Sequence, residues 1–201
     1  MNCRWDRGLL CRLWLFLFTY TVISFSGIVI VGFLTEVWWT LIVYIIFFLI
    51  FFLVFEIRVL CSHCPFYAEN SRILHCLGNY GTPKLWRYHP EPLNRFEKAS
   101  LIMGFSFFAG FPLLTEAYGV GFLLNHSTNY GSVTIFGYMS VTLATLGALI
   151  VLFYVLRKFY CSKCINFSCP FNTVPRSILN EYLKRNPVIK EAWKKKGYES
   201  G

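Results

Sequence analysis

Long runs of apolar residues alternate with polar segments along the whole chain, and four of the runs are long enough to cross a lipid bilayer. They cover residues 13–34, 38–55, 99–118 and 132–156. A bilayer core about 30 Å thick needs roughly 20 apolar residues in an α-helix. The pattern therefore predicts an all-α integral membrane protein with four transmembrane helices in contact with the lipid bilayer.

The polar segments group the four predicted helices into two hairpins. Only residues 35–37 separate the first two runs, and a polar, Gly-containing loop at 119–131 separates the last two. We expect a first hairpin repeat at 1–98, which includes a long Cys-rich loop. A second hairpin repeat is expected at 99–175, and a basic amphipathic tail at 176–201.

Short matches between the two halves indicate an internal duplication. Each half is a predicted hairpin followed by a Cys-x-x-Cys motif, at 61–64 and at 161–164. The tripeptide Leu-Thr-Glu at 34–36 recurs at 114–116. A parallel repeat relates two halves by an axis along the membrane normal, so the duplication predicts that both Cys pairs lie at one membrane face.

The distribution of positive charge predicts the orientation of the chain in the membrane. All 19 Lys and Arg residues lie before the first apolar run, between the second and third runs, or after the fourth. Because cytoplasmic loops carry an excess of Lys and Arg, we expect both termini and the middle loop in the cytoplasm. The net charge of +9 then follows from membrane topology, and nucleic acid is not an expected partner.

Six of the eight cysteines follow the second and fourth apolar runs, on the predicted cytoplasmic side. They are Cys61, Cys64, Cys76, Cys161, Cys164 and Cys169. A reducing compartment disfavours disulfides, and clustered Cys-x-x-Cys motifs there favour metal ligation. Zinc takes four such ligands in a tetrahedron, and iron–sulfur clusters also bind Cys thiolates. We therefore expect a small Cys-rich cytoplasmic cap that holds zinc or a [4Fe–4S] cluster.

Two arrangements of ligands are consistent with this spacing. One shared site would use the two Cys-x-x-Cys motifs and leave Cys76 and Cys169 over. One site in each half would use three cysteines and a fourth ligand, either from a partner or from a histidine such as His63 or His75. Spacing alone does not decide between these arrangements, or between zinc and iron–sulfur.

Cationic and aromatic residues outside the apolar runs indicate contact with the membrane surface. The middle loop carries Lys84, Trp86 and Arg87, and the tail carries Trp193 in a basic amphipathic stretch. Such residues commonly place their charges on lipid phosphates and their rings in the interface. We expect these four side chains at the membrane surface.

Two glutamates are the acidic residues nearest the predicted outer ends of the helices. Glu36 and Glu116 occupy equivalent positions of the two predicted repeats. A pair of intramembrane carboxylates could bind a cation or relay a proton, whereas carboxylates in the headgroup region would have no such role. The sequence leaves both alternatives open.

The sequence contains no phosphate-binding glycine loop, nucleophile elbow or metalloprotease motif. We expect an accessory or structural membrane subunit, whose metal site joins the two hairpins and which works with other membrane-protein subunits. An iron–sulfur electron-transfer subunit and a membrane thiol oxidoreductase are the alternatives. Helix count and paired cysteines resemble four-helix thiol oxidoreductases of the disulfide-bond and vitamin K epoxide reductase types. Those families keep their cysteines on the oxidising side, whereas the charge bias here predicts the reducing side.

Overall fold

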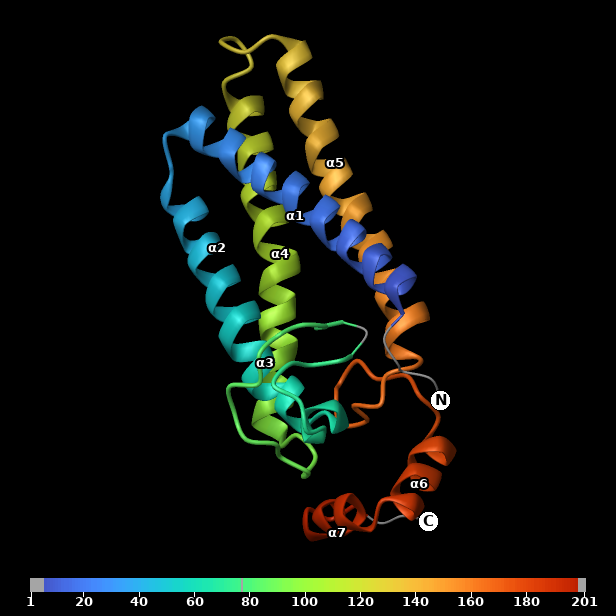
Figure 1. The fold of residues 1–201 in the computed structure, drawn as a ribbon. Coiled ribbons are helices and arrows are strands. Elements are labelled where there is room, and N and C mark those ends of the chain that lie inside the picture. Colours follow the sequence, from blue (N-terminus) through green and yellow to red (C-terminus); the bar gives the residue numbers. More distant parts are fainter. Residues whose placement is uncertain (1–5, 77, 199–201) are drawn as a thin grey trace. The chain divides into compact units, whose positions relative to one another are not determined.

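The computed structural model describes residues 6–76 and 78–198, and its regular elements in these ranges are helices. Four helical stretches are long and apolar enough to cross a membrane (Figure 1). They are Arg7–Thr35, Trp39–His63, Arg95–Asn125 and Ser132–Cys161. The prediction of an all-helical protein with four candidate membrane spans is therefore confirmed.

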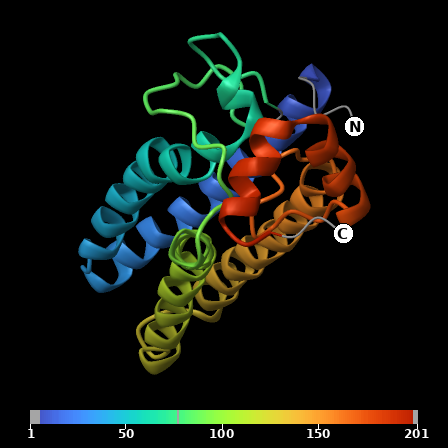
Figure 2. The ribbon, with the colours of Figure 1, turned by 90° about the horizontal axis from the view of Figure 1, so that it is seen from below.

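Two of the long stretches are not continuous α-helices. In the second stretch, the α-helix gives way to a π-helical segment, a short α-helix and a 3₁₀ turn, and a further 3₁₀ turn follows the stretch. The fourth stretch ends in a π-helical segment. Two short helices follow in the tail, and Figure 2 shows them joined by a tight turn. The bounds are α1 Arg7–Thr35, α2 Trp39–Ile50, η1 Phe51–Phe55, α3 Glu56–Val59, η2 Cys61–His63, η3 Pro65–Ala68, α4 Arg95–Asn125, α5 Ser132–Val155, η4 Leu156–Cys161, α6 Arg176–Arg185 and α7 Pro187–Lys195.

The chain divides into two compact units, and long helices contribute residues to both. The bundle unit consists of residues 14–51 and 104–154. The Cys-rich unit consists of the described residues of 1–13, 52–103 and 155–201, and it contains both Cys-x-x-Cys motifs and the tail helices. Each unit has its own buried side chains.

Large apolar side chains are exposed along the helices of the bundle unit. On α5 alone, Val133 is 84% exposed, Phe136 67% and Leu143 66%. Soluble monomers rarely expose contiguous apolar surface on this scale. Lipid is therefore the solvent that suits these helices.

A proline inside α4 shapes the core of the bundle unit. Pro112 has no backbone N–H, so the carbonyl of Phe108 loses its partner in the helical ladder. The hydroxyls of Tyr20 on α1 and Tyr44 on α2 both donate to that carbonyl, each at 3.0 Å. Both tyrosine side chains are fully buried. Because an unpaired backbone group costs several kcal/mol in lipid, these bonds accommodate the proline and fasten α1 and α2 to α4.

Aromatic rings add to the contact between α2 and α4 in this unit. The rings of Phe47 and Phe107 lie 4.4 Å apart, and those of Tyr44 and Phe111 stack at 5.7 Å. Aromatic pairs at such distances contribute about 0.5–1.5 kcal/mol beyond their buried area. The many phenylalanines of the apolar runs thus include packing residues as well as lipid-facing ones.

The third helix is longer than the sequence predicts. We expected it to end at residue 118 and to be followed by a loop at 119–131, but α4 continues to Asn125. Leu123, in the added turns, is fully buried against Val31 and Tyr138. This apolar packing outweighs the modest cost of glycines inside a helix.

The two Leu-Thr-Glu matches occupy different surroundings. Thr35 is the last residue of α1, and Glu36 follows it in the turn with a positive φ of 59°. Glu116 lies inside α4, nine residues before its end. The expectation that both glutamates mark equivalent helix ends is therefore wrong, and the duplication itself stays a prediction.

Substitutions of the two tyrosines, made with and without Pro112, test whether their hydroxyls replace the helical hydrogen bond that the proline removes. Replacing both Tyr20 and Tyr44 with Phe removes both of these hydroxyl donors from the Phe108 carbonyl, so the unfolding free energy should fall by about 1–3 kcal/mol. Each single variant should lose less, because the other hydroxyl still donates. Reversible unfolding in mixed detergent micelles measures these differences.

The matched background is Pro112→Ala, which restores an N–H that can bond to the Phe108 carbonyl. In that background the double substitution should cost clearly less than in the native chain. An equal loss in both backgrounds would show that the tyrosines act through packing alone.

Candidate Cys-rich site

Each Cys-x-x-Cys motif follows a π-helical segment. The segment Phe51–Phe55 precedes the first motif by one turn of helix, and Leu156–Cys161 leads directly into the second. Such segments are rare and occur frequently at functional sites. Both motifs thus begin where the regular helix is interrupted, in the Cys-rich unit.

The first cysteine cluster is organised by Asn79. Its side-chain amide nitrogen lies 3.1 Å from Cys61 Sγ and 3.2 Å from Glu56 Oε1, and donates to both. Its backbone N–H donates to Cys76 Sγ at 3.2 Å. One residue thereby holds two sulfur atoms and a carboxylate close together. Hydrogen bonds to sulfur of this kind orient and stabilise thiolate ligands in metal sites.

Both cysteines of the first Cys-x-x-Cys motif are buried. Cys61 is 6% exposed and Cys64 is 8% exposed. Cys61 packs in a small apolar core with Ile57, Tyr67 and Leu74. The first Cys-x-x-Cys motif is therefore part of a folded core.

The second cluster is held in a closed loop by Asn172. Its side-chain amide donates to the carbonyl oxygen of Cys164 at 2.8 Å and to that of Asn166 at 2.9 Å. The backbone N–H of Thr173 donates to the carbonyl of Cys161 at 3.2 Å. These bonds bring the end of the segment back to its first cysteine.

A buried asparagine joins the two clusters. Asn166 is 4% exposed, and its side-chain amide donates to the carbonyl of Leu60 at 2.8 Å. Leu60 directly precedes Cys61 in the chain. The hydroxyl of Ser168 donates to Asn166 Oδ1 at 2.9 Å and fixes the orientation of the amide. The two Cys-x-x-Cys segments, about a hundred residues apart in sequence, therefore adjoin.

Electrostatics also indicates that the clusters lie close together. The pKa of Cys169 is raised to about 11, chiefly by burial and to a smaller extent by the neighbouring charges of Cys161 and Glu56. Glu56 belongs to the first cluster, through Asn79, whereas Cys161 belongs to the second. Without a bound cation, the Cys169 thiol is thus neutral at physiological pH.

The clusters adjoin without forming a complete ligand set. Within residues 6–76 and 78–198, no group of three His, Cys, Asp or Glu side chains is arranged to hold a metal ion. The cysteines of both motifs are thus placed in one unit, while the choice between a shared site and one site per half stays open.

The two candidate histidine ligands have other polar neighbours. His63 Nδ1 lies 2.8 Å from the carbonyl of Val59, and its ring stacks on His89 with centroids 5.2 Å apart. His75 Nδ1 lies 3.1 Å from Glu69 Oε2. These contacts give both imidazoles structural partners within the middle loop.

Two of the three middle-loop residues expected at the membrane surface make contacts within the protein. Lys84 Nζ donates to the carbonyl of Glu69 at 2.8 Å, and burial lowers the pKa of this amine. Trp86 packs against the apolar core around Cys61, and its backbone N–H donates to the hydroxyl of Tyr67 at 2.9 Å. Arg87 is exposed. Of the three, Arg87 has the side chain that is open to a lipid phosphate.

The tail forms a core of its own, which the sequence analysis missed. Trp193 on α7 is 8% exposed and packs with Leu179 and Leu183 of α6. Phe167 and Tyr182 pack against the same cluster. The apolar faces of α6 and α7 thus bury each other, and the position of Trp193 at the membrane surface stays a prediction.

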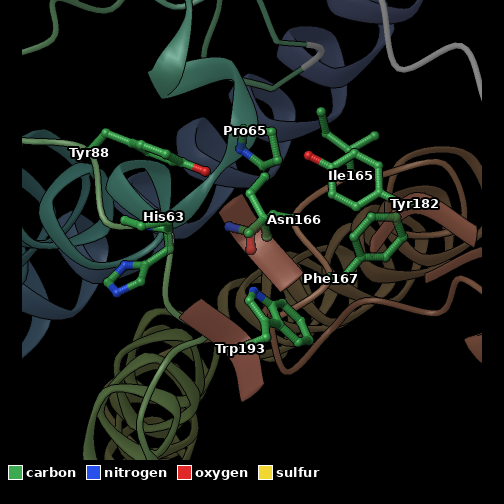
Figure 3. Close-up of a pocket in the computed structure, with 10 residues that line it drawn as sticks. His63, Pro65, Tyr88, Ile165, Asn166, Phe167, Tyr182 and Trp193 are labelled. Atoms are coloured by element: carbon green, nitrogen blue, oxygen red, sulfur yellow. The ribbon is translucent and has the colours of Figure 1, made fainter. Parts of the chain in front are cut away.

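The Cys-rich unit also contains a small cavity, drawn in Figure 3. Asn166 lies at its centre, with His63 and Tyr88 to one side and Phe167 and Tyr182 to the other. Its volume is about 10 Å³, which is space for roughly one water molecule. The cavity is therefore too small for an organic substrate.

Comparison with known proteins found no matching family model, no matching curated protein and no matching solved structure.

The bond between Asn166 and the Leu60 carbonyl generates a direct prediction. Asn166→Ala removes the side-chain donor of the partly buried Leu60 carbonyl, so the unfolding free energy should fall by about 1–3 kcal/mol. The thiols of both clusters should also react faster with a maleimide, since the segments separate more readily. Thermal unfolding and mass-spectrometric thiol mapping measure the two effects.

A surface substitution in the same unit is the control for this prediction. Glu191→Gln weakens an exposed ion pair with Lys195 on α7, 3.4 Å long, which contributes little. If Asn166→Ala were as harmless as Glu191→Gln, Asn166 would not join the two segments.

Proposed function

We propose that this chain is an accessory or structural membrane subunit whose two Cys-rich segments together bind a thiophilic metal ion on the cytoplasmic side. The observation that carries the proposal is the bond from Asn166 to the Leu60 carbonyl. It joins the segment of the second Cys-x-x-Cys motif to the residue next to Cys61. A metal held by both motifs would fasten the two hairpins together at the same place.

The chemistry of the donors supports this proposal. Thiolates are the ligands that zinc and iron–sulfur clusters prefer. Asn79 already directs N–H groups at Cys61 and Cys76, and these would stabilise negative charge on sulfur. Because burial raises the pKa of Cys61 and of Cys161, a bound cation would have to displace their protons. Metal binding would then release protons and become tighter as the pH rises.

The size of the cavity favours a structural role over an enzymatic one. The space beside Asn166 accommodates about one water molecule. A shared tetrahedral zinc site would use Cys61, Cys64, Cys161 and Cys164, and needs no substrate pocket. A [4Fe–4S] cluster in an electron-transfer subunit is the second candidate, since the additional Cys76 and Cys169 supply further thiols near both motifs.

The metal proposal predicts the composition of the purified protein. Protein purified without chelators and under anaerobic conditions should contain about one zinc ion per chain for a shared site. Cys61→Ser and Cys161→Ser should each lose all of the metal, because either substitution breaks the same tetrahedron. Elemental analysis gives the stoichiometry, and a brown colour with bound iron and sulfide would assign the cluster instead.

Cys11→Ser is the matched control, since Cys11 is exposed and lies outside both clusters. It should retain the metal of the native chain. Loss of half of the metal in each cluster variant would indicate one site per half. Protein that bound neither metal, before or after reconstitution, would contradict the proposal.

The proposed orientation gives an independent prediction. The loop between α4 and α5 contains the exposed Ser127 and no Lys or Arg, so it should face away from the cytoplasm. Ser127→Cys should therefore be labelled by a membrane-impermeant maleimide added to intact cells. The native chain should be labelled only after the membrane is permeabilised, which exposes Cys11. Equal labelling of the native chain in intact cells would reverse the topology.

A further inference from the structure

Glu116 is a fully buried carboxyl group within a candidate membrane span, in the bundle unit. It lies nine residues before the end of α4, which is about 14 Å along the helix axis. The hydroxyl of Thr145 on α5 donates to Glu116 Oε1 at 2.8 Å. The second oxygen, Oε2, is buried and has no hydrogen-bond partner in the described structure.

The chain makes room for this carboxyl group against the backbone of α1. A Cβ atom at Gly27 would lie 2.7 Å from Glu116 Cδ, which is an overlap. The carbonyl of Gly27 accepts a hydrogen bond from Tyr138 of α5 at 3.2 Å. Ser24, on the same face of α1 as Gly27, also has a buried hydroxyl. Three helices thus meet around Glu116, and glycine is the residue that permits their approach.

The bundle unit offers no positive charge to an ionised Glu116. Residues 14–51 and 104–154 contain no Lys or Arg. Besides tyrosines, their other ionisable side chains are Glu36 and His126, and both are exposed in turns. The tyrosines of the unit add no positive charge, since a phenol is neutral or, when ionised, negative. A buried carboxylate without a counter-charge is so costly that the group takes up a proton instead.

We propose that Glu116 is a proton-binding site in the bundle unit and carries a proton at neutral pH. The carboxylate and one proton from solvent combine to the acid, and release regenerates both. A proton suits this place better than a metal cation, which needs several oxygen ligands. A carboxyl group that binds a proton within a membrane span is typical of functional sites, and this one lies wholly outside the Cys-rich unit.

Infrared spectroscopy of the protein in lipid vesicles tests this proposal. At neutral pH the spectrum should contain the carbonyl stretch of a protonated carboxyl group, which shifts on exchange into D₂O. Glu116→Gln should remove this band, and it preserves the size of the side chain and its acceptor for Thr145. Glu36→Gln should leave the band unchanged. A Glu116→Gln spectrum that instead lost a carboxylate band would overturn the proposal.

Two further measurements separate the remaining outcomes. If the acid band were replaced by a carboxylate band on adding sodium chloride in place of choline chloride, the occupant would be a cation, and the proton site would be refuted.

Should Glu116→Gln fail to fold, a lipid-soluble carbodiimide can be applied to the native chain, since its N=C=N group adds to protonated carboxyl groups. Peptide mapping should find the acylurea at Glu116 and not at Glu36, and the reverse result would refute the proposal.

Discussion

The carbonyl of Phe108 is the point on which the bundle unit depends. Pro112 deprives it of its helical partner, and in lipid no water is present to replace that partner. Tyr20 and Tyr44 supply the missing donors from two other helices. A local defect in one helix thereby becomes a tertiary contact among three, and the arrangement of α1 and α2 against α4 follows from it.

The Cys-rich unit solves a similar problem with amide side chains. Asn166 donates to the carbonyl of Leu60, and Asn172 donates to the carbonyl of Cys164. Asn79 directs its donors at sulfur atoms instead of carbonyls. In both units, buried side-chain donors join segments that are far apart in sequence. The two Cys-rich segments adjoin because the backbone beside the cysteines is held in this way, and a metal would add its ligand bonds to this framework.

The four spans could be predicted from the sequence because their apolar runs are long, and length dominates the choice of a membrane helix. The end of α4 could not be predicted, since residues 119–125 combine glycines with apolar residues. Their packing against α1 and α5 decides that the helix continues. The burial of Glu116 was missed for the same reason, because the helix was expected to end at 118. The sequence does contain one indication of this burial, because no Lys or Arg lies near Glu116 along the chain.

The cysteine motifs could also be recognised from the sequence, but the residues that organise them could not. Asn79, Asn166 and Asn172 are ordinary loop residues in the sequence, and long-range hydrogen bonds give them their roles. The packing of Trp193 against α6 was missed because an amphipathic helix has the same pattern whether its apolar face meets lipid or a neighbouring helix. Here α6 and α7 cover each other.

X-ray absorption spectroscopy of the metal-loaded protein tests most directly whether the two Cys-rich segments bind one ion. The account predicts a first coordination shell of sulfur, at about 2.3 Å for zinc, with sulfur ligands from both segments. Cys61→Ser and Cys161→Ser, reloaded with metal at high concentration, should each show fewer sulfur ligands. A shell made only of nitrogen and oxygen atoms, or one that neither substitution changed, would contradict the account.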